Sequence, residues 1–355
     1  MVDVNDMVYF ESGPVAQRDI YMYDPSVDET TVVSLSDRNE IILDVVTGGG
    51  VVFTRDEGAG DVDLWFYKTG VGLTQVGSDV ASSIFQDGSL TYNGSTSDGM
   101  IVFTETVSAT DTNIYYWDST TRTTTPFAVN VDVLEVYHAV TSNAKIIYTH
   151  QVSNTDWNVH AKTVGGSDVD LSDSTAMDVF QAVTALNDVV LFRDDNAMHV
   201  YDDSAVGLLG ADTGGSNALT FVAVLPSGNV VYSKNGSGLH RWDVSNASQL
   251  VSVTGTFAGA MENGTDFVTA VHNAGQNDIY IWRESSDALQ TVSVDAADEN
   301  FVVSTTASDG LVFSRQGLNA NYDLYVWDLA KGERRLTNDG YTHVLVGTYF
   351  LDTRW

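Results

Sequence analysis

One six-residue phrase recurs along the whole chain and constrains the fold more than any other feature. It is rich in β-branched and aromatic residues, which favours a β-strand. Eight copies are present: Asp19–Asp24, Asp63–Lys68, Asn113–Asp118, Asn158–Thr163, Ala197–Asp202, Gly238–Asp243, Asp278–Arg283 and Asp323–Asp328. Such regular self-similarity indicates that the chain repeats one supersecondary unit.

A second apolar strand precedes each copy and ends at an ionisable residue, as in Val51–Arg55 and Leu311–Arg315. A short apolar strand lies before this pair, and an edge strand follows it. The successive end residues are 38 to 50 positions apart. Four strands in about 40–45 residues is the spacing of propeller blades. The sequence therefore predicts an all-β chain in which residues 1–355 form a single eight-bladed β-propeller domain, with four antiparallel strands (a to d) per blade.

The two ends of the chain are predicted to close the ring together. The N-terminal blade starts almost directly with a b strand, Met7–Glu11, and so lacks strand a. The C-terminal segment His343–Leu351 is apolar and has no partner strand. Pairing the two would remove exposed strand edges, which promote aggregation.

The best-defined repeat also resembles that of a known family. Gly310–Arg315 followed by Asp323–Thr337, with turns such as Ser308–Gly310, resembles the repeat of TolB-like propellers over essentially the whole chain. The family's Ser-Pro-Asp-Gly turn is never complete here, and eight blades exceed its commoner six or seven. The resemblance implies a secreted or periplasmic scaffold for partner binding, for gating peptidase domains, or for lyases of pectic oligosaccharides with a channel metal.

The charge balance narrows the choice of partners. The chain has 48 acidic and 16 basic residues, a net charge of −32, and no Cys. Such a field repels phosphate backbones and anionic lipids, and no apolar run is long enough to span a bilayer, so we expect neither nucleic-acid binding nor membrane insertion. Abundant Asp with little Lys suits a salt-adapted surface, where ions screen self-repulsion. The chain has no Gly-x-Ser-x-Gly nucleophile elbow of the α/β-hydrolase type. We also expect the protein to be a monomer.

Ionisable residues end every b strand and are predicted to ring one mouth of the channel. They are Glu11, Arg55, Glu105, His150, Arg193, Lys234, His272 and Arg315. One interpretation is a set of surface charges that pair with nearby acids. The other is a mouth that recognises an anionic ligand, because the scarce bases concentrate there and Arg suits bidentate carboxylate binding.

Strand a borders the predicted channel and carries polar residues in blades 2 to 5. Eleven or twelve positions before the b-strand ends lie Asp44, Asn93, His138 and Gln181, whereas the later blades have Val222, Ala260 and Val303. The polar group could hold one divalent cation (Ca or Mn) or a sugar. The alternative is a water-filled channel lined by ordinary polar residues.

Two functions remain open from the sequence. The first is a non-catalytic binding or scaffold propeller that recognises a protein or carbohydrate ligand on one face. The alternative is a channel-centred enzyme, either a lyase of acidic oligosaccharides or a metal-dependent hydrolase of lactonase or phosphotriesterase type.

In the enzyme hypothesis each candidate residue has a role. His138 and Gln181 bind the metal, and His150 is the general base because an ordinary imidazole is largely neutral at pH 7. Arg55 and Arg193 hold a substrate carboxylate or a developing oxyanion. The remaining substrate-binding candidates are Asp44, Asn93, Glu105, Lys234, His272 and Arg315. In contrast, His160, His199 and His240 and the repeated Trp residues are predicted to pack between blades.

Overall fold

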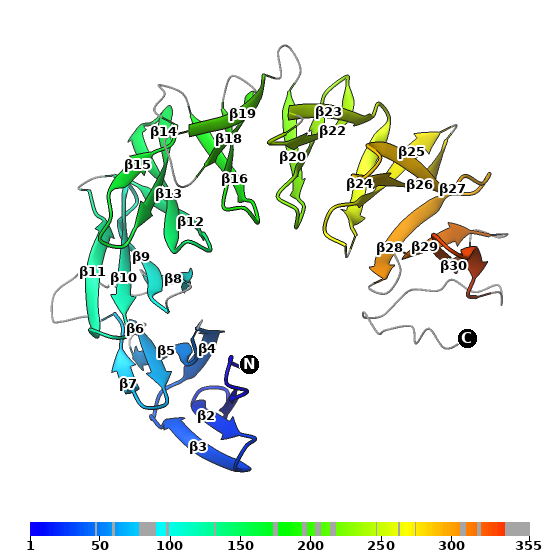
Figure 1. Ribbon diagram of the computed structural model, residues 1–355. Coiled ribbons are helices and arrows are strands. Elements are labelled where there is room, and N and C mark those ends of the chain that lie inside the picture. Colours follow the sequence, from blue (N-terminus) through cyan, green and yellow to red (C-terminus); the bar gives the residue numbers. More distant parts are fainter. Residues whose placement is uncertain are drawn as a thin grey trace. The chain divides into compact units, whose positions relative to one another are not determined.

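The computed structural model describes residues 1–46, 48–58, 61–77, 90–96, 99–130, 133–172, 177–193, 197–202, 207–213, 218–245, 247–261, 263–273, 275–305, 310–317 and 321–337. Within these ranges the regular elements are all strands (Figure 1). Two compact units are distinguished, Met1–Phe180 with Asp203–Val206, and Gln181–Asp202 with Gly207–Trp355. The single domain predicted for residues 1–355 stays a prediction.

The first half of the chain forms one three-stranded and three four-stranded sheets in its described part. The three-stranded sheet contains β1 (Val8–Ser12), β2 (Asp19–Asp24) and β3 (Glu29–Ser34). The others are β4 (Glu40–Val45), β5 (Val51–Gly58), β6 (Asp61–Lys68), β7 (Gly72–Gln75); β8 (Leu90–Ser95), β9 (Ile101–Ser108), β10 (Asp111–Asp118), β11 (Thr123–Ala128); and β12 (Glu135–Val140), β13 (Lys145–Ser153), β14 (Asp156–Thr163), β15 (Asp168–Asp170).

The second half forms four further four-stranded sheets. They are β16 (Asp178–Val183), β17 (Val189–Arg193), β18 (Ala197–Asp202), β19 (Gly207–Thr213); β20 (Leu219–Val224), β21 (Val230–Lys234), β22 (Gly238–Asp243), β23 (Ala247–Ser252); β24 (Gly255–Ala260), β25 (Phe267–Asn273), β26 (Gln276–Arg283), β27 (Ala288–Ser293); and β28 (Glu299–Thr305), β29 (Gly310–Gln316), β30 (Tyr322–Asp328), β31 (Gly332–Arg335). Each sheet keeps its strands in chain order, so the predicted a-b-c-d blade is confirmed.

The hydrophobic core lies between neighbouring sheets. In the first unit Phe66 of β6 meets Trp117 of β10 with ring centroids 5.1 Å apart, inside one buried cluster. In the second unit Leu239 and Trp282 belong to one buried cluster that joins two sheets in the same way. Alternating strand residues face opposite sides of a sheet, so each sheet contributes apolar side chains to two such layers. The predicted packing role of the repeated Trp residues is confirmed.

The three histidines at the shared c-strand position also pack as aromatic residues. His160 stacks on Tyr148 of the adjacent b strand at 5.1 Å, and His240 stacks on Tyr232 at 5.6 Å. The side chains of His199 and His240 are buried. His160 and His240 therefore stack as aromatic residues within their own sheets, and the predicted packing between blades stays a prediction for them.

The turn between the first two strands of a sheet recurs with the same hydrogen bonds. In one sheet the amide of Thr141 donates to the carbonyl of Lys145 at 2.8 Å, and Ala144 donates back to Thr141 at 3.0 Å. The equivalent bonds join Leu225 to Asn229 and Gly228 to Leu225. The fourth turn residue has a positive φ, 58° at Ala144 and 91° at Gly228, which glycine adopts without steric cost.

The chain start contains the same turn. Asp3 donates to Met7 at 3.0 Å, and Asp6, at φ 62°, donates back to Asp3. Met1 and Tyr9 exchange two backbone hydrogen bonds of 2.7 Å, so Met1 and Val2 lie where an inner strand ends. This sheet nevertheless has three strands, β1 to β3, and only an isolated bridge joins Val2 to Val8, so the prediction that the N-terminal blade lacks a regular strand a is confirmed. Residues 338–355 lie outside the described residues, and with them the predicted closing strand 343–351.

Across the residues that the structure describes, no helix is long and apolar enough to cross a membrane.

Candidate functional site

The antiparallel order brings three strand ends together at one end of each sheet. In the β4–β7 sheet Glu40 starts the first strand and pairs in register with Arg55 of the second, which pairs with Asp63 of the third. We call this the b–c end, because it carries the turn between strands b and c. The opposite end, with the a–b and c–d turns, is called the a–b end.

Arg55 is held by side chains of its own and the preceding sheet. Its Nε donates to Glu40 Oε1 at 2.8 Å, and its Nη2 donates to Ser34 Oγ at 2.5 Å. The guanidinium also lies 4.1 Å from the ring centroid of Trp65. Glu40 is fully buried, so Arg55 compensates a carboxylate that water cannot reach. The Arg55 guanidinium is therefore already committed to contacts inside the fold.

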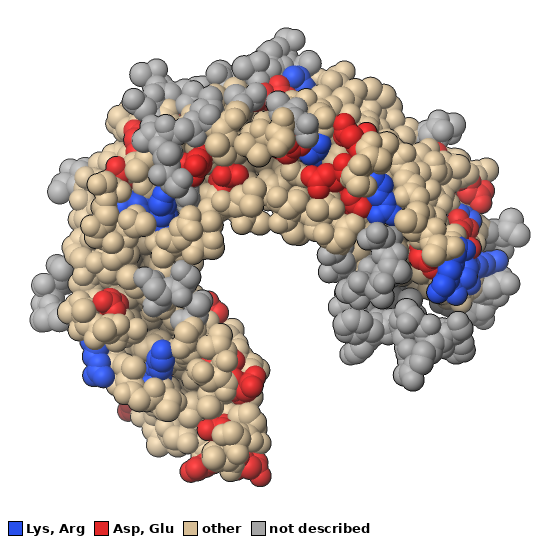
Figure 2. All heavy atoms as spheres, viewed as in Figure 1, with Lys and Arg blue, Asp and Glu red and all other residues tan. Residues whose placement is uncertain are grey.

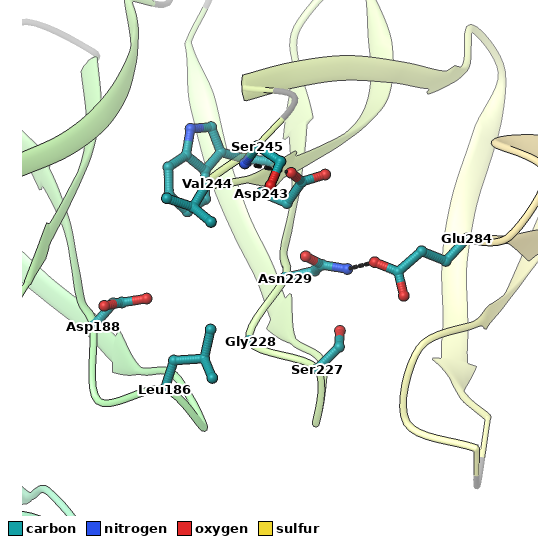
Figure 3. A pocket seen from close by; sticks show the side chains of 10 residues that line it. Leu186, Asp188, Ser227, Gly228, Asn229, Asp243, Val244, Ser245 and Glu284 are labelled. Carbon is teal, nitrogen blue, oxygen red and sulfur yellow. Dashed lines mark hydrogen bonds between the residues drawn. The ribbon is translucent and has the colours of Figure 1, made fainter.

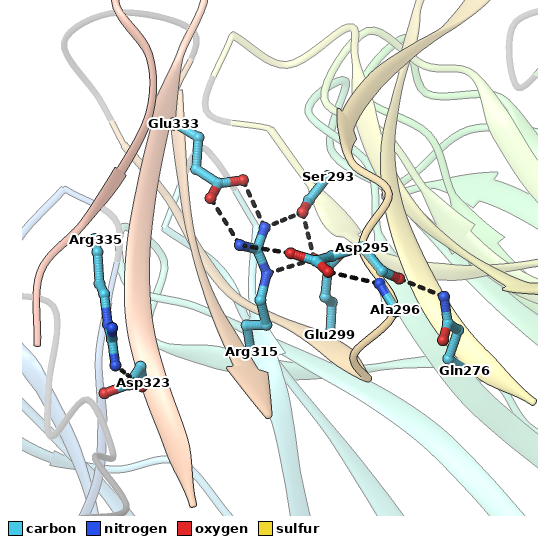
Figure 4. Close-up of polar contacts among 9 residues, drawn as sticks. All are labelled: Gln276, Ser293, Asp295, Ala296, Glu299, Arg315, Asp323, Glu333 and Arg335. Carbon is cyan, nitrogen blue, oxygen red and sulfur yellow. Dashed lines mark hydrogen bonds and ion pairs between the residues drawn. The ribbon is translucent and has the colours of Figure 1, made fainter. Parts of the chain in front are cut away.

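Arg315 makes the same contacts in the β28–β31 sheet (Figure 4). Its Nε donates to the buried Glu299 at 2.7 Å, and its Nη2 donates to Ser293 at the end of β27. Glu333 accepts two further bonds, of 2.8 and 2.6 Å. Burial alone would lower the pKa of Arg315, but Glu333 and Glu299 outweigh it and raise the pKa. Figure 2 likewise shows basic side chains beside acidic ones near β30 and β31.

The other predicted ring members also have partners or lie outside the described side chains. Lys234 contacts Asp212 at 3.0 Å. Glu11 accepts bonds from Arg18 at 2.9 Å and from the amide of Ile42 at 2.8 Å. His272 is exposed and contacts Asn277. Val271, and not His272, pairs with the first residue of the inner strand, Gly255, so the predicted ring position in this sheet is shifted by one residue. Of Arg193 only the backbone is described.

Two buried carboxyl groups lie at the b–c ends of neighbouring sheets. Glu105 and Glu135 are each 1% exposed. Burial raises the pKa of Glu105, opposed by a hydrogen bond from Tyr115 and reinforced by Asp111. Burial also raises the pKa of Glu135 to about 7, although Asn130 donates to it. Glu105 occupies the register position of Arg55 and Arg315, whereas Glu135 occupies that of Glu40 and Glu299 and pairs in register with His150.

The polar row on strand a follows a β-bulge. In the β12–β13 pair the register shifts between Tyr137 and Ala139, which makes His138 the bulged residue. In the β4–β5 pair the bulge is at Leu43, so Asp44 is one position past it. The predicted equivalence of Asp44 with His138 is therefore wrong by one residue, because the spacing was counted from the strand end and not from the bulge. In the a–b strand pairs whose register is described, the bulged residues are Leu43, Asn93, His138, Val222, Ala258 and Val302.

The polar residues of this row bond to their own or the next sheet. Asn93 and His138 contact the Thr104 and Thr149 hydroxyls on the adjacent b strands. The His138 ring stacks on Phe180 at 4.5 Å, and burial lowers its pKa to about 4. Asp44 accepts a bond from the Tyr92 hydroxyl at 2.8 Å.

The structure does not bring His138 and His150 together. His138 reaches Thr149, which neighbours His150 in β13, and successive strand residues point to opposite faces. The His150 ring instead lies 5.7 Å from that of His160. Burial lowers the pKa of His150, and His160 adds to the effect. The side chains of His138 and His150 therefore lie on opposite faces of this sheet, and the shared site stays a prediction.

The predicted divalent cation finds no fitting ligand set in the described part of the chain. No group of three or more His, Asp or Glu side chains there could hold a metal ion. The His138 imidazole is engaged by Thr149, and Gln181 belongs to the other compact unit. The pairing of His138 with Gln181 around a Ca or Mn ion stays a prediction.

The residues that organise the b–c end include three that were not singled out in the sequence. They are Glu40, Glu135 and Glu299, each at the start of an inner strand and at most 1% exposed. Their signal was a fixed distance, because each precedes its partner at the b-strand end (Arg55, His150 or Arg315) by 15 or 16 residues.

Comparisons with known proteins identify the fold. No protein-family model matches the chain, and no curated protein matches it. The structure of Porphyromonas gingivalis dipeptidyl peptidase 4 matches 95% of this chain and 52% of its own, with 12% identity and a TM-score of 0.50. This chain thus spans about half the length of that peptidase.

Two further solved structures share less. The β-propeller domain of the Trilobed protease from Pyrococcus furiosus matches 94% of both chains, with 11% identity and a TM-score of 0.39. TolB from Acinetobacter baumannii matches 70% of this chain and 67% of its own, with 11% identity and a TM-score of 0.29. The predicted β-propeller with TolB-like blades is confirmed at the level of the fold, which does not choose a function.

Proposed function

We propose that this protein is a non-catalytic binding propeller that recognises a protein partner through the b–c ends of its blades. The observation that carries the proposal is the distribution of exposed aliphatic side chains. In the first unit Val15, Leu35, Val107, Val129 and Val152 lie at the b–c ends of their sheets and are 44–77% exposed. In the second unit Val253, Val294 and Leu336 occupy the same end. Exposed apolar surface rimmed by polar residues is typical of protein interaction sites.

The contacts of the basic side chains Arg55 and Arg315 favour a binding function over catalysis. A carboxylate-binding mouth would need guanidinium groups that face the solvent, but Arg55 and Arg315 bond to buried glutamates and a serine. The contact of His138 with Thr149, the residue next to His150 in β13, also argues against a site that both imidazoles share, since successive strand residues point to opposite faces. These contacts favour an interaction surface made of the exposed valines and leucines, which a partner protein can cover.

A partner for this surface should carry an apolar patch with basic residues around it. The net charge of −32 favours cationic partners by long-range attraction, and this attraction weakens with salt. Aliphatic side chains also suit a protein better than a glycan, since sugars are usually stacked on exposed aromatic rings. As part of the same proposal, the protein acts as a monomer outside the cytoplasm.

Selection from a displayed random-peptide library against the full chain tests the proposal. Peptides are then measured against a double variant, Val107→Asp with Val152→Asp, which places charge at the b–c ends of β9 and β13. The control is Val27→Asp, which is at least as exposed as Val107 and Val152 but lies in the c–d turn of the β1–β3 sheet. Selected peptides should lose affinity at least tenfold for the double variant and keep it for the control.

Other outcomes would contradict the proposal. Equal loss for the control and the double variant would mean that binding is set by charge alone. Binding on a glycan array with no peptide binding would give the surface to carbohydrate, and cleavage of acidic oligosaccharides or lactones would restore the enzyme alternative.

A further inference from the structure

The b–c turn of the β20–β23 sheet exposes an asparagine that is followed by a glycine. The chain has three such Asn-Gly pairs, which begin at Asn93, Asn235 and Asn263. Asn235 and Gly236 lie in the turn between β21 and β22, and both are exposed. The side-chain amide carbon of an asparagine and the next backbone nitrogen can close a five-membered ring. Glycine favours this reaction because it has no Cβ to hinder the approach.

The turn leaves both reacting groups available. Its closing hydrogen bond runs from the amide of Ser237 to the carbonyl of Lys234 at 2.9 Å, and the backbone amide of Asn235 donates to Ala218 at 3.0 Å. Gly236 has a φ of 76°, which glycine adopts without strain. Within the described residues, neither the Gly236 amide nor the Asn235 side chain has a hydrogen-bond partner. The attacking nitrogen and the carbon that it attacks are therefore both open to water.

A second Asn-Gly pair, in the a–b turn of the β24–β27 sheet, is held by the fold. Asn263 Oδ1 accepts bonds from the amides of Thr265 and Asp266, and its Nδ2 donates to Asp266 at 2.9 Å. The amide of Gly264 donates to Met261 at 3.0 Å, so the attacking nitrogen is occupied as well. Ring closure here would have to break these bonds.

Two further asparagines are restrained in the same way. Asn93 lies inside β8, and its Nδ2 donates to the Thr104 hydroxyl. Asn229 is buried at the a–b end of the β20–β23 sheet, and its Nδ2 donates to Glu284 (Figure 3). The next residue is Val230, whose branched side chain also hinders ring closure. The exposed Asn-Gly turn of this sheet therefore differs from each of these sites in its freedom to react.

We propose that Asn235 is a site of spontaneous covalent modification, at which the side-chain amide is converted to aspartate and isoaspartate. The Gly236 nitrogen loses its proton to water and attacks Cγ of Asn235. The new N–Cγ bond forms as the Cγ–Nδ2 bond breaks, and Nδ2 leaves as ammonia. Water then adds to either carbonyl of the cyclic imide and opens it, which gives the two products. Water is the sole co-reactant, and it reaches this exposed turn.

The modification changes the charge and the backbone of the b–c end. A neutral amide becomes a carboxylate next to Lys234, whose ammonium group lies 3.0 Å from Asp212. Isoaspartate also adds a methylene group to the backbone of the turn. Gly238, where the turn ends, lies against the backbone of Ser252 and Val253, so the altered turn adjoins one of the exposed aliphatic residues. The reaction itself does not depend on the proposed function.

Peptide mapping by mass spectrometry after storage of the full chain at mildly alkaline pH tests the proposal. Storage in heavy-oxygen water and digestion in ordinary water separate modification of the folded chain from modification during digestion. We expect conversion at Asn235 to be at least tenfold faster than at Asn93, Asn229 or Asn263. In denaturant the rates of the three Asn-Gly pairs should differ less than threefold, because the restraints of the fold are then removed.

Matched variants assign the change in charge to one residue. On ion exchange the stored wild-type chain should develop an acidic species. Asn235→Gln should not, since glutamine would have to close a six-membered ring, and Asn263→Gln should behave as the wild type. Equal rates at Asn235 and Asn263 in the folded chain would refute the proposal, as would an unchanged Asn235 where the denatured chain reacts. If Asn263→Gln fails to fold, the peptide map of the wild-type chain decides.

Discussion

Replacing Glu135 by Gln should change how the stability of the protein depends on pH. Glu135 is 1% exposed at the start of β12, and burial, reinforced by Asp111, raises its pKa from 4.5 to about 7. The folded state therefore holds the proton more tightly than the unfolded state. The stability from this group is fully present below pH 4.5 and is lost as pH rises to about 7. The difference corresponds to about 3 kcal/mol, at about 1.4 kcal/mol per pKa unit.

Glutamine keeps the shape and the hydrogen bond from Asn130 but cannot ionise. Chemical denaturation between about pH 5 and pH 8 should show the wild-type chain losing about 2–3 kcal/mol more than Glu135→Gln. Glu29→Gln is the control, because it removes the same charge from an exposed position of β3. A wild-type profile parallel to that of Glu135→Gln would refute the reasoning. So would an equal change in Glu29→Gln, which would assign the effect to net charge.

Two further perturbations test other parts of the structure. Arg315→Met should cost about 3–5 kcal/mol in denaturant unfolding, because it leaves the fully buried Glu299 without its cation. Arg38→Met, which removes an exposed pair with Asp37, should cost less than about 0.5 kcal/mol, and similar losses for the two would show that Arg315 acts only at the surface. The melting temperature should rise between about 0.1 M and 1 M NaCl, as the Debye length falls from about 10 Å to about 3 Å. A flat or falling melting curve would remove the salt-adaptation hypothesis.

The blades could be predicted from the sequence because their determinants are local. A strand such as Asp323–Asp328 is a run of apolar and aromatic residues between two aspartates, and its repetition every 40 or so positions makes neighbouring sheets bury equivalent faces. The expected strand Asp323–Asp328 agrees with β30 (Tyr322–Asp328) to within one residue. Repetition also indicated a structural role for His160 and His240, because each occupies a strand position that is aromatic in other blades. Both stack on tyrosines of the adjacent strand.

The candidate site was harder to predict because it depends on which way side chains turn. Arg55 and Arg315 were found as a periodic feature, but only the structure shows that each turns toward a buried glutamate 15 or 16 residues earlier. The bulge in strand a also shifts Asp44 past the position of His138, which a count of residues cannot reveal.

The contacts of Arg55 determine where this chain can be divided into portable modules. Ser34, Glu40 and Arg55 come from the last strand of one sheet and the first two strands of the next, yet they lie within a short stretch of sequence. Ser293, Glu299 and Arg315 repeat the arrangement. A segment cut at the connection between two sheets would separate the serine from its glutamate and arginine. A segment cut in the b–c turns keeps all three together, so a blade moved into another propeller should be excised from one b–c turn to the next.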